Sequence, residues 1–551
     1  MEKYNLAIVL GITLILNAGF FDYSAAVCGA VICFWLFVRL LKKKKFYKRD
    51  RRAVFAIPVL LLCLSFLVSL WAVDVSENLF GALRLGVLCL WIVLVRNSSA
   101  EEKECARKSI PFLGAAMVVV SVAAYFIPSL KNAFWENGRL AGFFQYANTC
   151  AFFLMMGTIL VLTGQQKKVE KYFLSAVLTA GVLLTGSRSI LLLEVLWAAY
   201  HAVREKSFRK PFLAGSMTFL ILGGAVFFCT GSTKNITRIF SIFQSNSTVW
   251  GRLLYARDAV VLLAKKFYGL GRMGYYYSQG TFQSGVYHVR FVHNDFLQTA
   301  LDYGVLALVL AVIFVVWQLR FGRQEAYEKE ILVLSVLAGC VDFHFQYLLI
   351  PMTVLLFLDY GNVEREKKRE LIAEYVFLPV LTGAFVYLAI ASGCAKAGRM
   401  DIALSMLPDY SYAQEKAMKS RAGTQEAYDL AQKLIHKNPY NISAYIVRGT
   451  MYASSFQVEK CLTDFDRVLE LDPYNTEYYK QYDKLLFSME QQLKSMTESA
   501  AEETGKIRER RQKLSEDLAA MEKRTSSLAY KIKDVPQFSY LEDQNGEEQI
   551  Q

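Results

Sequence analysis

The sequence predicts an all-α fold, a polytopic bundle of membrane helices followed by a soluble helical region. Three observations support this prediction. Hydrophobic residues make up 54% of the 551 residues, and aromatic residues make up 14%. Over roughly the first 395 residues the apolar side chains form long blocks rather than amphipathic stripes, which is typical of membrane spans. Beyond these blocks the chain becomes charged and carries an internal repeat.

Each membrane span needs about 20 mostly apolar residues, because the helix itself must satisfy every backbone polar group inside the bilayer. About thirteen segments meet this requirement. They cover residues 5–20, 24–41, 53–71, 79–96, 110–127, 148–164, 171–186, 188–203, 211–230, 299–319, 330–344, 346–360 and 372–394. The first has further spans behind it and no clear small-x-small cleavage site, so we expect a retained span rather than a signal peptide.

Lysine and arginine residues in the short loops predict the orientation, because short basic loops remain in the cytoplasm. The loop 42–52 carries eight basic residues and is expected inside. Because successive loops alternate between the two sides, the cytoplasmic side also receives the segments 103–108, 167–171, 204–210, 320–329 and 365–369. The segment 72–78 then lies outside. The pattern predicts a multi-pass membrane protein with a cytoplasmic N-terminus and an extracytoplasmic C-terminus.

The net charge of +13 owes much to these cytoplasmic loops, where anionic lipid headgroups are a sufficient partner, so we expect no nucleic acid. Ten cysteines are present, but most fall within predicted spans, and Cys461 alone lies well clear of the membrane on the outer side. A disulfide framework is therefore not expected.

One loop between predicted spans, residues 231–298, is much longer than the others and is the first place to look for chemistry. It contains eight basic residues against two aspartates. Long loops are exempt from the charge rule, so this loop is compatible with the outer face. Its excess positive charge indicates an anionic ligand.

The soluble region begins near residue 398 and contains a repeat over residues 398–490. Asn438-Pro439-Tyr440-Asn441 recurs 34 residues later as Asp472-Pro473-Tyr474-Asn475, and this period resembles tetratricopeptide repeats. Such repeats usually bind a peptide or protein, so a protein partner is a hypothesis here. Residues 491–535 show heptad spacing, which indicates a short coiled coil or a helix folded back onto the repeats. The acidic tail, 536–551, is expected to be disordered.

Two groups of polar side chains at predicted membrane boundaries are candidates for chemistry. His293 closes the long loop between amide and carboxylate neighbours, and such a histidine is suited to proton transfer near neutral pH. Arg188 follows Ser187 in a turn between two predicted spans, and its guanidinium matches phosphate oxygens in a bidentate geometry. Each has a structural alternative, because boundary histidines often only form hydrogen bonds and boundary arginines often only reach lipid phosphates.

Four stretches together resemble the O-antigen ligase and polymerase superfamily of polytopic glycan transferases. They are Gly138–Phe143 with Asn148, Thr185–Arg188, Arg252 with Tyr255 and Gly269–Gly271, and His293–Gln298 with Gly304. The resemblance covers roughly the first 395 residues. It implies a transferase, independent of metals and of any cofactor, that passes a glycan from undecaprenyl diphosphate to an acceptor hydroxyl at the outer face. It also implies that His293 activates the acceptor and that Arg188 and Arg252 hold the diphosphate.

Further residues complete the expected site. Arg139 and Arg257 are second-rank candidates for binding the diphosphate, and Arg257 lies five residues after Arg252. The expected supporting residues are Asn148, Ser187, Asn294, Asp295 and Gln298. Asp342 and His344, near the outer end of a predicted span, form the main rival to His293 as the base.

A transporter or flippase for a lipid-linked glycan is the alternative from a different functional class. It would place ionisable residues near the bilayer midplane between repeated halves. Arg84 and Glu194 do lie inside predicted spans, where they serve function or pair with each other. Most candidate residues gather instead in one outer loop and its flanking turns, which favours the enzyme. Surface polysaccharide ligase, polymerase and protein O-oligosaccharyltransferase share these motifs and remain open.

Overall fold

A computed structural model describes residues 2–42, 52–164, 167–205, 247–285, 287–361, 372–494 and 501–531, together with the single residues 210, 217 and 221. Helices dominate, and the expected all-α class is confirmed. The described residues contain one two-stranded antiparallel sheet, in which β1 (Trp135–Glu136) pairs with β2 (Arg139–Leu140). Most of the predicted span 211–230, residues 231–246 of the long loop and the tail 536–551 lie outside the described residues, as do residues 43–51 and 362–371 of two basic loops.

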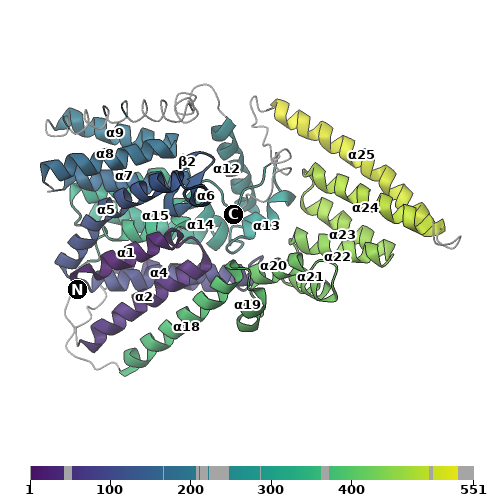
Figure 1. Ribbon diagram of the computed structural model, residues 1–551, viewed down its shortest axis with the longest axis horizontal. Helices are drawn as coiled ribbons and strands as arrows, with labels where there is room; N and C mark the ends of the chain where they lie inside the picture. Colours follow the sequence, from purple (N-terminus) through teal and green to yellow (C-terminus); the bar gives the residue numbers. More distant parts are fainter. Residues whose placement is uncertain are drawn as a thin grey trace.

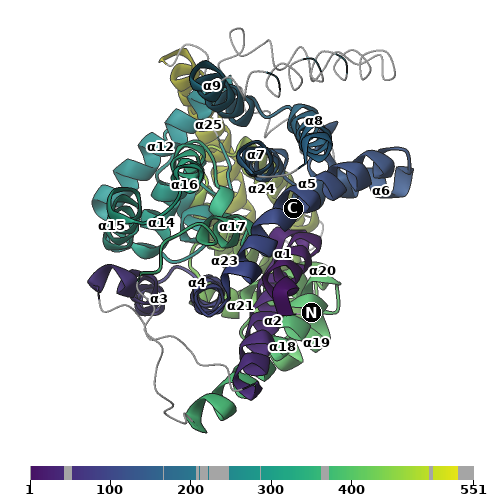
Figure 2. The same ribbon diagram turned by 90° about the vertical axis from the view of Figure 1, so that its left-hand side faces the viewer.

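Residues up to Lys396 form a bundle in which most of the long helices run in roughly one direction (Figure 1). The helices are α1 (Asn5–Ile15), α2 (Asp22–Leu41), α3 (Ile57–Val68), α4 (Val75–Arg96), α5 (Ala100–Tyr125), α6 (Pro128–Phe134), α7 (Ala147–Thr163), α8 (Lys168–Thr185), α9 (Arg188–Arg204), α12 (Ser247–Lys265), α13 (Gly274–Ser278), α14 (Asp295–Tyr303), α15 (Val305–Phe321), α16 (Ala326–Gly339), α17 (Leu349–Leu355) and α18 (Ile372–Lys396). Helix α7 lies among the others in the end-on view (Figure 2), and every residue from Ala147 to Leu162 is buried. An apolar surface on all sides is what a fully enclosed helix requires.

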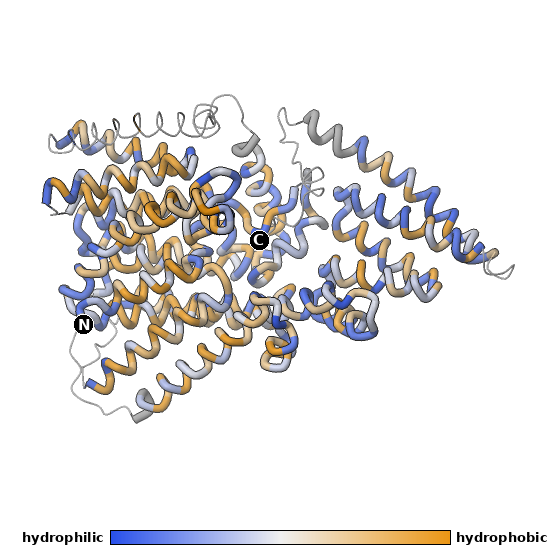
Figure 3. Tube along the Cα trace, viewed as in Figure 1, coloured by the Kyte–Doolittle hydropathy of each residue, from blue (hydrophilic) through white to orange (hydrophobic). Residues whose placement is uncertain are grey.

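Four described helices are long and apolar enough to cross a membrane: α2, α4, α5 and the part of α18 from Tyr375 to Lys396. Shorter apolar helices cover Asn5–Ile15, Ala53–Val68, Ala147–Thr163 and Val305–Phe321. Hydrophobic residues predominate along the bundle and hydrophilic residues in the C-terminal helices (Figure 3). The expected count of about thirteen spans is not confirmed by these helices.

Two predicted spans differ in the structure. The segment 346–360 contains only the seven helical residues of α17, which extend about 10 Å and are too short to cross the hydrocarbon core alone. The segment 299–319 is broken between α14 and α15 at Gly304, which has φ 89°. A Cβ atom on Gly269 would lie 2.6 Å from the backbone nitrogen of Gly304, so the two backbones meet where no side chain fits.

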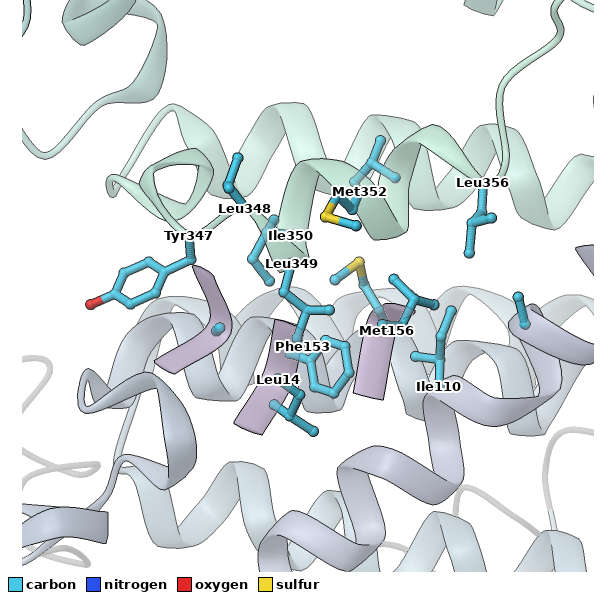
Figure 4. Close-up of a cluster of buried hydrophobic side chains, with 14 of the residues drawn as sticks. Leu14, Ile110, Phe153, Met156, Tyr347, Leu348, Leu349, Ile350, Met352 and Leu356 are labelled. Carbon is cyan, nitrogen blue, oxygen red and sulfur yellow. The ribbon is translucent and has the colours of Figure 1, made fainter. Parts of the chain in front are cut away.

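Helix α17 lies within the core of the bundle. Figure 4 shows Leu349 and Met352 beside Leu14 of α1 and Phe153 and Met156 of α7, all of them buried. Lipid tails are as apolar as these side chains, so close packing and dispersion rather than exclusion of water hold such contacts together. The packing fixes α17 and therefore the loop that precedes it.

The C-terminal region consists of packed helices that contact their neighbours in sequence. They are α19 (Met400–Met406), α20 (Ser411–Ser420), α21 (Gln425–Lys437), α22 (Ile442–Ser454), α23 (Val458–Leu471), α24 (Thr476–Lys494) and α25 (Ala501–Lys531). The two repeated Pro-Tyr turns lie between α21 and α22 and between α23 and α24. Ile507 and Leu514 of α25 are buried in one cluster with Tyr482 and Leu486 of α24. The tetratricopeptide-like assignment stays a prediction.

The C-terminal region is docked on the bundle by hydrogen bonds to two carboxylates of the bundle, of which Asp74 is buried and Asp22 partly buried. Tyr410 donates its hydroxyl proton to Asp22 Oδ2 at 3.0 Å, and Ser411 donates to Asp74 Oδ1 at 2.9 Å. Asp22 begins α2, and Asp74 caps α4. A Cβ atom on Gly280 would collide with the carbonyl oxygen of Leu471 at the end of α23, so the two regions also meet through backbone.

Tyr410→Phe tests this docking, because it removes the donor to Asp22 and keeps the ring. We expect the free energy of local opening to fall by about 1 kcal/mol, which makes amide hydrogen exchange in α19 and α20 about fivefold faster. Hydrogen–deuterium exchange read by mass spectrometry measures this. Tyr412→Phe removes a partly buried hydroxyl two residues away, and an equal effect of both changes would contradict the assigned role of Tyr410.

Candidate active site

The carboxylate of Asp342 is fully buried and receives hydrogen bonds from four other side chains. His293 Nδ1 lies 2.9 Å from Oδ1, and Arg252 Nη2 donates to Oδ2 at 3.0 Å. Tyr146 donates its hydroxyl proton to Oδ1 at 2.9 Å, and Asn148 Nδ2 donates to Oδ2 at 2.7 Å. Three residues that the sequence analysis selected, in separate parts of the chain, therefore meet at one carboxylate.

Electrostatics favour the charged form of Asp342. Burial raises the pKa of this carboxyl, but the charge and hydrogen bond of His293 and then the charge of Arg252 outweigh burial, so the pKa lies well below its ordinary value. Asp342 follows the end of α16, and the neighbouring Phe345 N–H donates to Asp295 at 3.1 Å. Asp342 is thus the bonded partner of His293 rather than a separate candidate base.

Local hydrogen bonds fix the turn that carries His293. The side-chain oxygen of Asn294 accepts from two backbone N–H groups in the first turn of α14, at 3.0 and 2.9 Å. Gln298 Oε1 accepts from the N–H of Val292 at 2.8 Å. Because Nδ1 of His293 faces Asp342, its Nε2 is the ring nitrogen left for a ligand, and the side chain is 21% exposed. Asn294 and Gln298 therefore hold the turn that carries His293, whereas Asp295 holds the loop of Asp342.

Arg139 extends the network to the start of α9. Its Nη2 donates to Asn148 Oδ1 at 2.6 Å, and its Nε donates to the carbonyl oxygen of Thr185 at 2.8 Å. Gly186 ends α8 in the left-handed region at φ 60°, and this reverses the chain so that Arg188 begins α9.

The N-terminus of α9 combines several features of an anion site. The helix has 17 residues, and its first N–H groups carry partial positive charge. Ser187, its N-cap, is buried, and its hydroxyl has no hydrogen-bond partner among the residues that the structure describes. Arg188 is partly exposed beside it. This end of the helix suits a phosphate group.

Other candidate arginines and acids lie elsewhere. Arg257 is exposed, whereas Arg252 reaches Asp342 from the same helix, because a five-residue spacing turns the two side chains to different faces. The structure therefore does not bring Arg257 into the network. Arg84 donates to the carbonyl oxygens of Phe20 and Gln346. Glu194 accepts from Thr179 at 3.4 Å, so Arg84 and Glu194 do not pair with each other.

An apolar cavity of about 200 Å³ lies near the network, between α3, α4, α14, α15, α16 and α17. Leu61, Leu88 and Phe314 are among its apolar residues, and Asp295 and Thr299 border it. Asp295 also accepts a hydrogen bond from Phe345 in the loop of Asp342, so this residue borders both the cavity and the site. An apolar lining of this kind accepts a hydrocarbon chain.

Residues 173–312 match the family model described as O-antigen ligase. The matched segment contains Arg188, Arg252 and His293, whereas Asn148 and Asp342 lie outside it. The resemblance to the O-antigen ligase and polymerase superfamily is therefore confirmed. No match is found among curated proteins.

The family match and the apolar helices identify a membrane protein of polysaccharide biosynthesis. The match supports glycan ligase or polymerase activity in general, with lipid-linked glycans in the membrane as substrates.

Sequence reasoning did not select Tyr146 and did not anticipate the bond between Asp342 and His293. Tyr146 lies two residues before Asn148 and also accepts a hydrogen bond from it at 3.1 Å. The sequence does offer one signal for Asp342. A carboxylate at the end of an apolar segment needs a charged or hydrogen-bonding partner, which predicts a polar contact at this position.

Asp342→Asn tests the role of the carboxylate in stability. The change leaves Arg252 without its buried counter-charge, so we expect the protein to lose about 3 kcal/mol of stability at neutral pH. The folded-state pKa of Asp342 is depressed, so its contribution is present above the unfolded pKa of about 4 and declines as the pH falls below that value. Thermal unfolding in detergent between pH 2 and pH 8 measures the difference. Asp401→Asn, at an exposed position, is the control, and equal losses in both variants would contradict the prediction.

Proposed function

We propose that the protein transfers a glycan from a polyprenyl diphosphate, expected to be undecaprenyl diphosphate, to an acceptor hydroxyl at the outer face of the membrane. The observation that carries this proposal is the convergence of His293, Arg252 and Asn148 on Asp342, with Arg139 bonded to Asn148, in a chain with an O-antigen ligase segment. Surface polysaccharide ligation and polymerisation both fit this reaction, and so does transfer to a protein hydroxyl.

His293 is proposed as the general base. His293 donates its Nδ1–H to Asp342 in a hydrogen bond, so the lone pair on Nε2 faces the acceptor. The buried carboxylate then stabilises the imidazolium that forms when Nε2 takes the proton of the acceptor hydroxyl. The proton leaves to solvent after the transfer.

The diphosphate is assigned to Arg139, Arg188, Arg252 and the N-terminus of α9. Guanidinium groups form charge-assisted hydrogen bonds to phosphate oxygens, and the free hydroxyl of Ser187 supplies one more donor. As the bond between the anomeric carbon and the phosphate oxygen breaks, negative charge grows on that oxygen, and fixed cations stabilise it. Direct attack by the acceptor oxygen inverts the anomeric carbon.

The polyprenyl chain of the donor needs an apolar environment beside these cations. The cavity between α3, α4 and α14–α17 meets this need, and Asp295 at its border also holds the loop of Asp342. We assign a segment of the polyprenyl chain to this cavity. The C-terminal helices are proposed to lie on the same outer side and to recruit a protein partner.

His293→Ala, Arg188→Ala and Arg252→Gln test the mechanism in proteoliposomes that contain a radiolabelled glycan on undecaprenyl diphosphate. We expect transfer to an acceptor to fall by about 10²- to 10⁴-fold in His293→Ala, because the base is lost. Arg257→Gln is the matched control for Arg252→Gln, since both residues lie on α12, and it is expected to retain activity. A chelator is expected to have no effect.

Two results would contradict the proposal. One is full transfer by His293→Ala. The other is a lipid-linked glycan that crosses the bilayer with no covalent product, which would favour a transporter.

A further inference from the structure

Two cations lie on adjacent aromatic rings outside the network of Asp342. The guanidinium carbon of Arg290 lies 5.4 Å from the centroid of the Phe20 ring, and Lys396 Nζ lies 4.1 Å from the centroid of the Phe21 ring. The two rings are 5.3 Å apart in an edge-to-face contact. Arg290 comes from the loop that carries His293, and Lys396 ends α18. The geometry is a pair of positive charges on one aromatic support.

Neither cation forms an ion pair with a carboxylate among the described residues. Arg290 Nε is buried and has no hydrogen-bond partner in the described part of the chain. Asp22 and Glu77, acids of the same region, are paired with Arg272 at 3.2 and 3.0 Å.

The charges that act on Lys396 are those of two further cations, Arg290 and Lys416. Like charges in one place repel each other, and a buried guanidinium nitrogen that forms no hydrogen bond is costly, so the pair is suited to an incoming anion.

A strip of aromatic rings connects this pair to His293. The ring of Phe343 lies 5.1 Å from the His293 ring and 5.4 Å from Phe291, and Phe291 lies 6.3 Å from Phe20. Phe291, which links the two parts of the strip, is buried, whereas Phe20, Phe21 and Phe343 are partly exposed. Exposed parts of aromatic rings contact the apolar faces of sugars. A sugar chain over these three exposed rings would thus have His293 at one end and the two cations at the other.

We propose that Arg290 and Lys396 bind a carboxylate or phosphate substituent of the acceptor glycan, whose sugar rings lie along the strip from Phe21 to Phe343. The inference rests on the proposed function, because that function supplies an acceptor at His293. The donor diphosphate is assigned to Arg139, Arg188, Arg252 and the start of α9, which leaves the cation pair for the acceptor. The site therefore selects acidic over neutral acceptors.

The experiment measures binding without any donor. Full-length protein in phosphatidylcholine nanodiscs is titrated with a fluorescent tetrasaccharide that contains two glucuronic acid residues, and with its carboxyl-reduced neutral counterpart. We expect Arg290→Gln to weaken binding of the acidic probe about tenfold and Lys396→Gln about threefold, since each removes a charge-assisted contact. Arg290→Lys keeps the charge and is expected to stay within about threefold of the wild type.

Lys131→Gln is the matched control, because Lys131 Nζ also lies over an aromatic ring, 4.3 Å from the centroid of Tyr125. Equal losses in Arg290→Gln and Lys131→Gln would overturn the proposal, as would equal affinity of the wild type for the acidic and neutral probes. Competition by phosphatidylglycerol in the nanodisc would identify a lipid headgroup as the ligand and also overturn it. Thermal unfolding checks that each variant is folded. The titration measures binding and no glycosyl transfer, so its outcome and the outcome of the transfer assay can be told apart.

Discussion

The buried carboxylate of Asp342 is the constraint on which the site depends. A charge without exposure to water is tolerated only when donors surround it, and here the donors come from the start of α7, from α12 and from the turn before α14. Each donor satisfies the carboxylate and is held by it in return. The same interaction therefore keeps an imidazole and a guanidinium at fixed positions beside one another, as a preorganised polar site requires.

Backbone contacts support this arrangement at a distance from the carboxylate. Val305 donates to the carbonyl oxygen of Phe267 at 2.8 Å, and Leu270 donates to that of Leu301 at 2.7 Å. These bonds join the segment after α12 to α14 and to the start of α15. The elements that carry Arg252 and His293 are therefore joined both through Asp342 and through backbone hydrogen bonds. Gly269 and Gly304 make the backbone contact possible, because a side chain at either would separate the two backbones.

The sequence predicted the helical class and several residues that meet at the site, because apolar blocks and the grouping of His293, Arg252, Arg139 and Asn148 into recognisable stretches are local signals. It did not predict the central role of Asp342. The contacts of Asp342 with His293 and Arg252 join residues 49 and 90 positions apart, and no local pattern encodes such a meeting. The predicted span 346–360 differs from the structure for a related reason, because an apolar segment of this length is compatible with a short buried helix as well as with a membrane crossing.

The connection between α18 and the C-terminal helices is three residues long, Ala397 to Arg399, and Arg399 donates its N–H to the carbonyl oxygen of Cys394 at 2.8 Å. A long flexible tether would let a bound molecule sample a volume, and its effective concentration at the site would follow tether length. Here the tether is short and closed by a hydrogen bond. On the proposed function, a molecule held by the C-terminal helices would be presented at one distance from His293, and the reach of the acceptor itself, rather than the length of a flexible linker, would decide which hydroxyl reaches the imidazole.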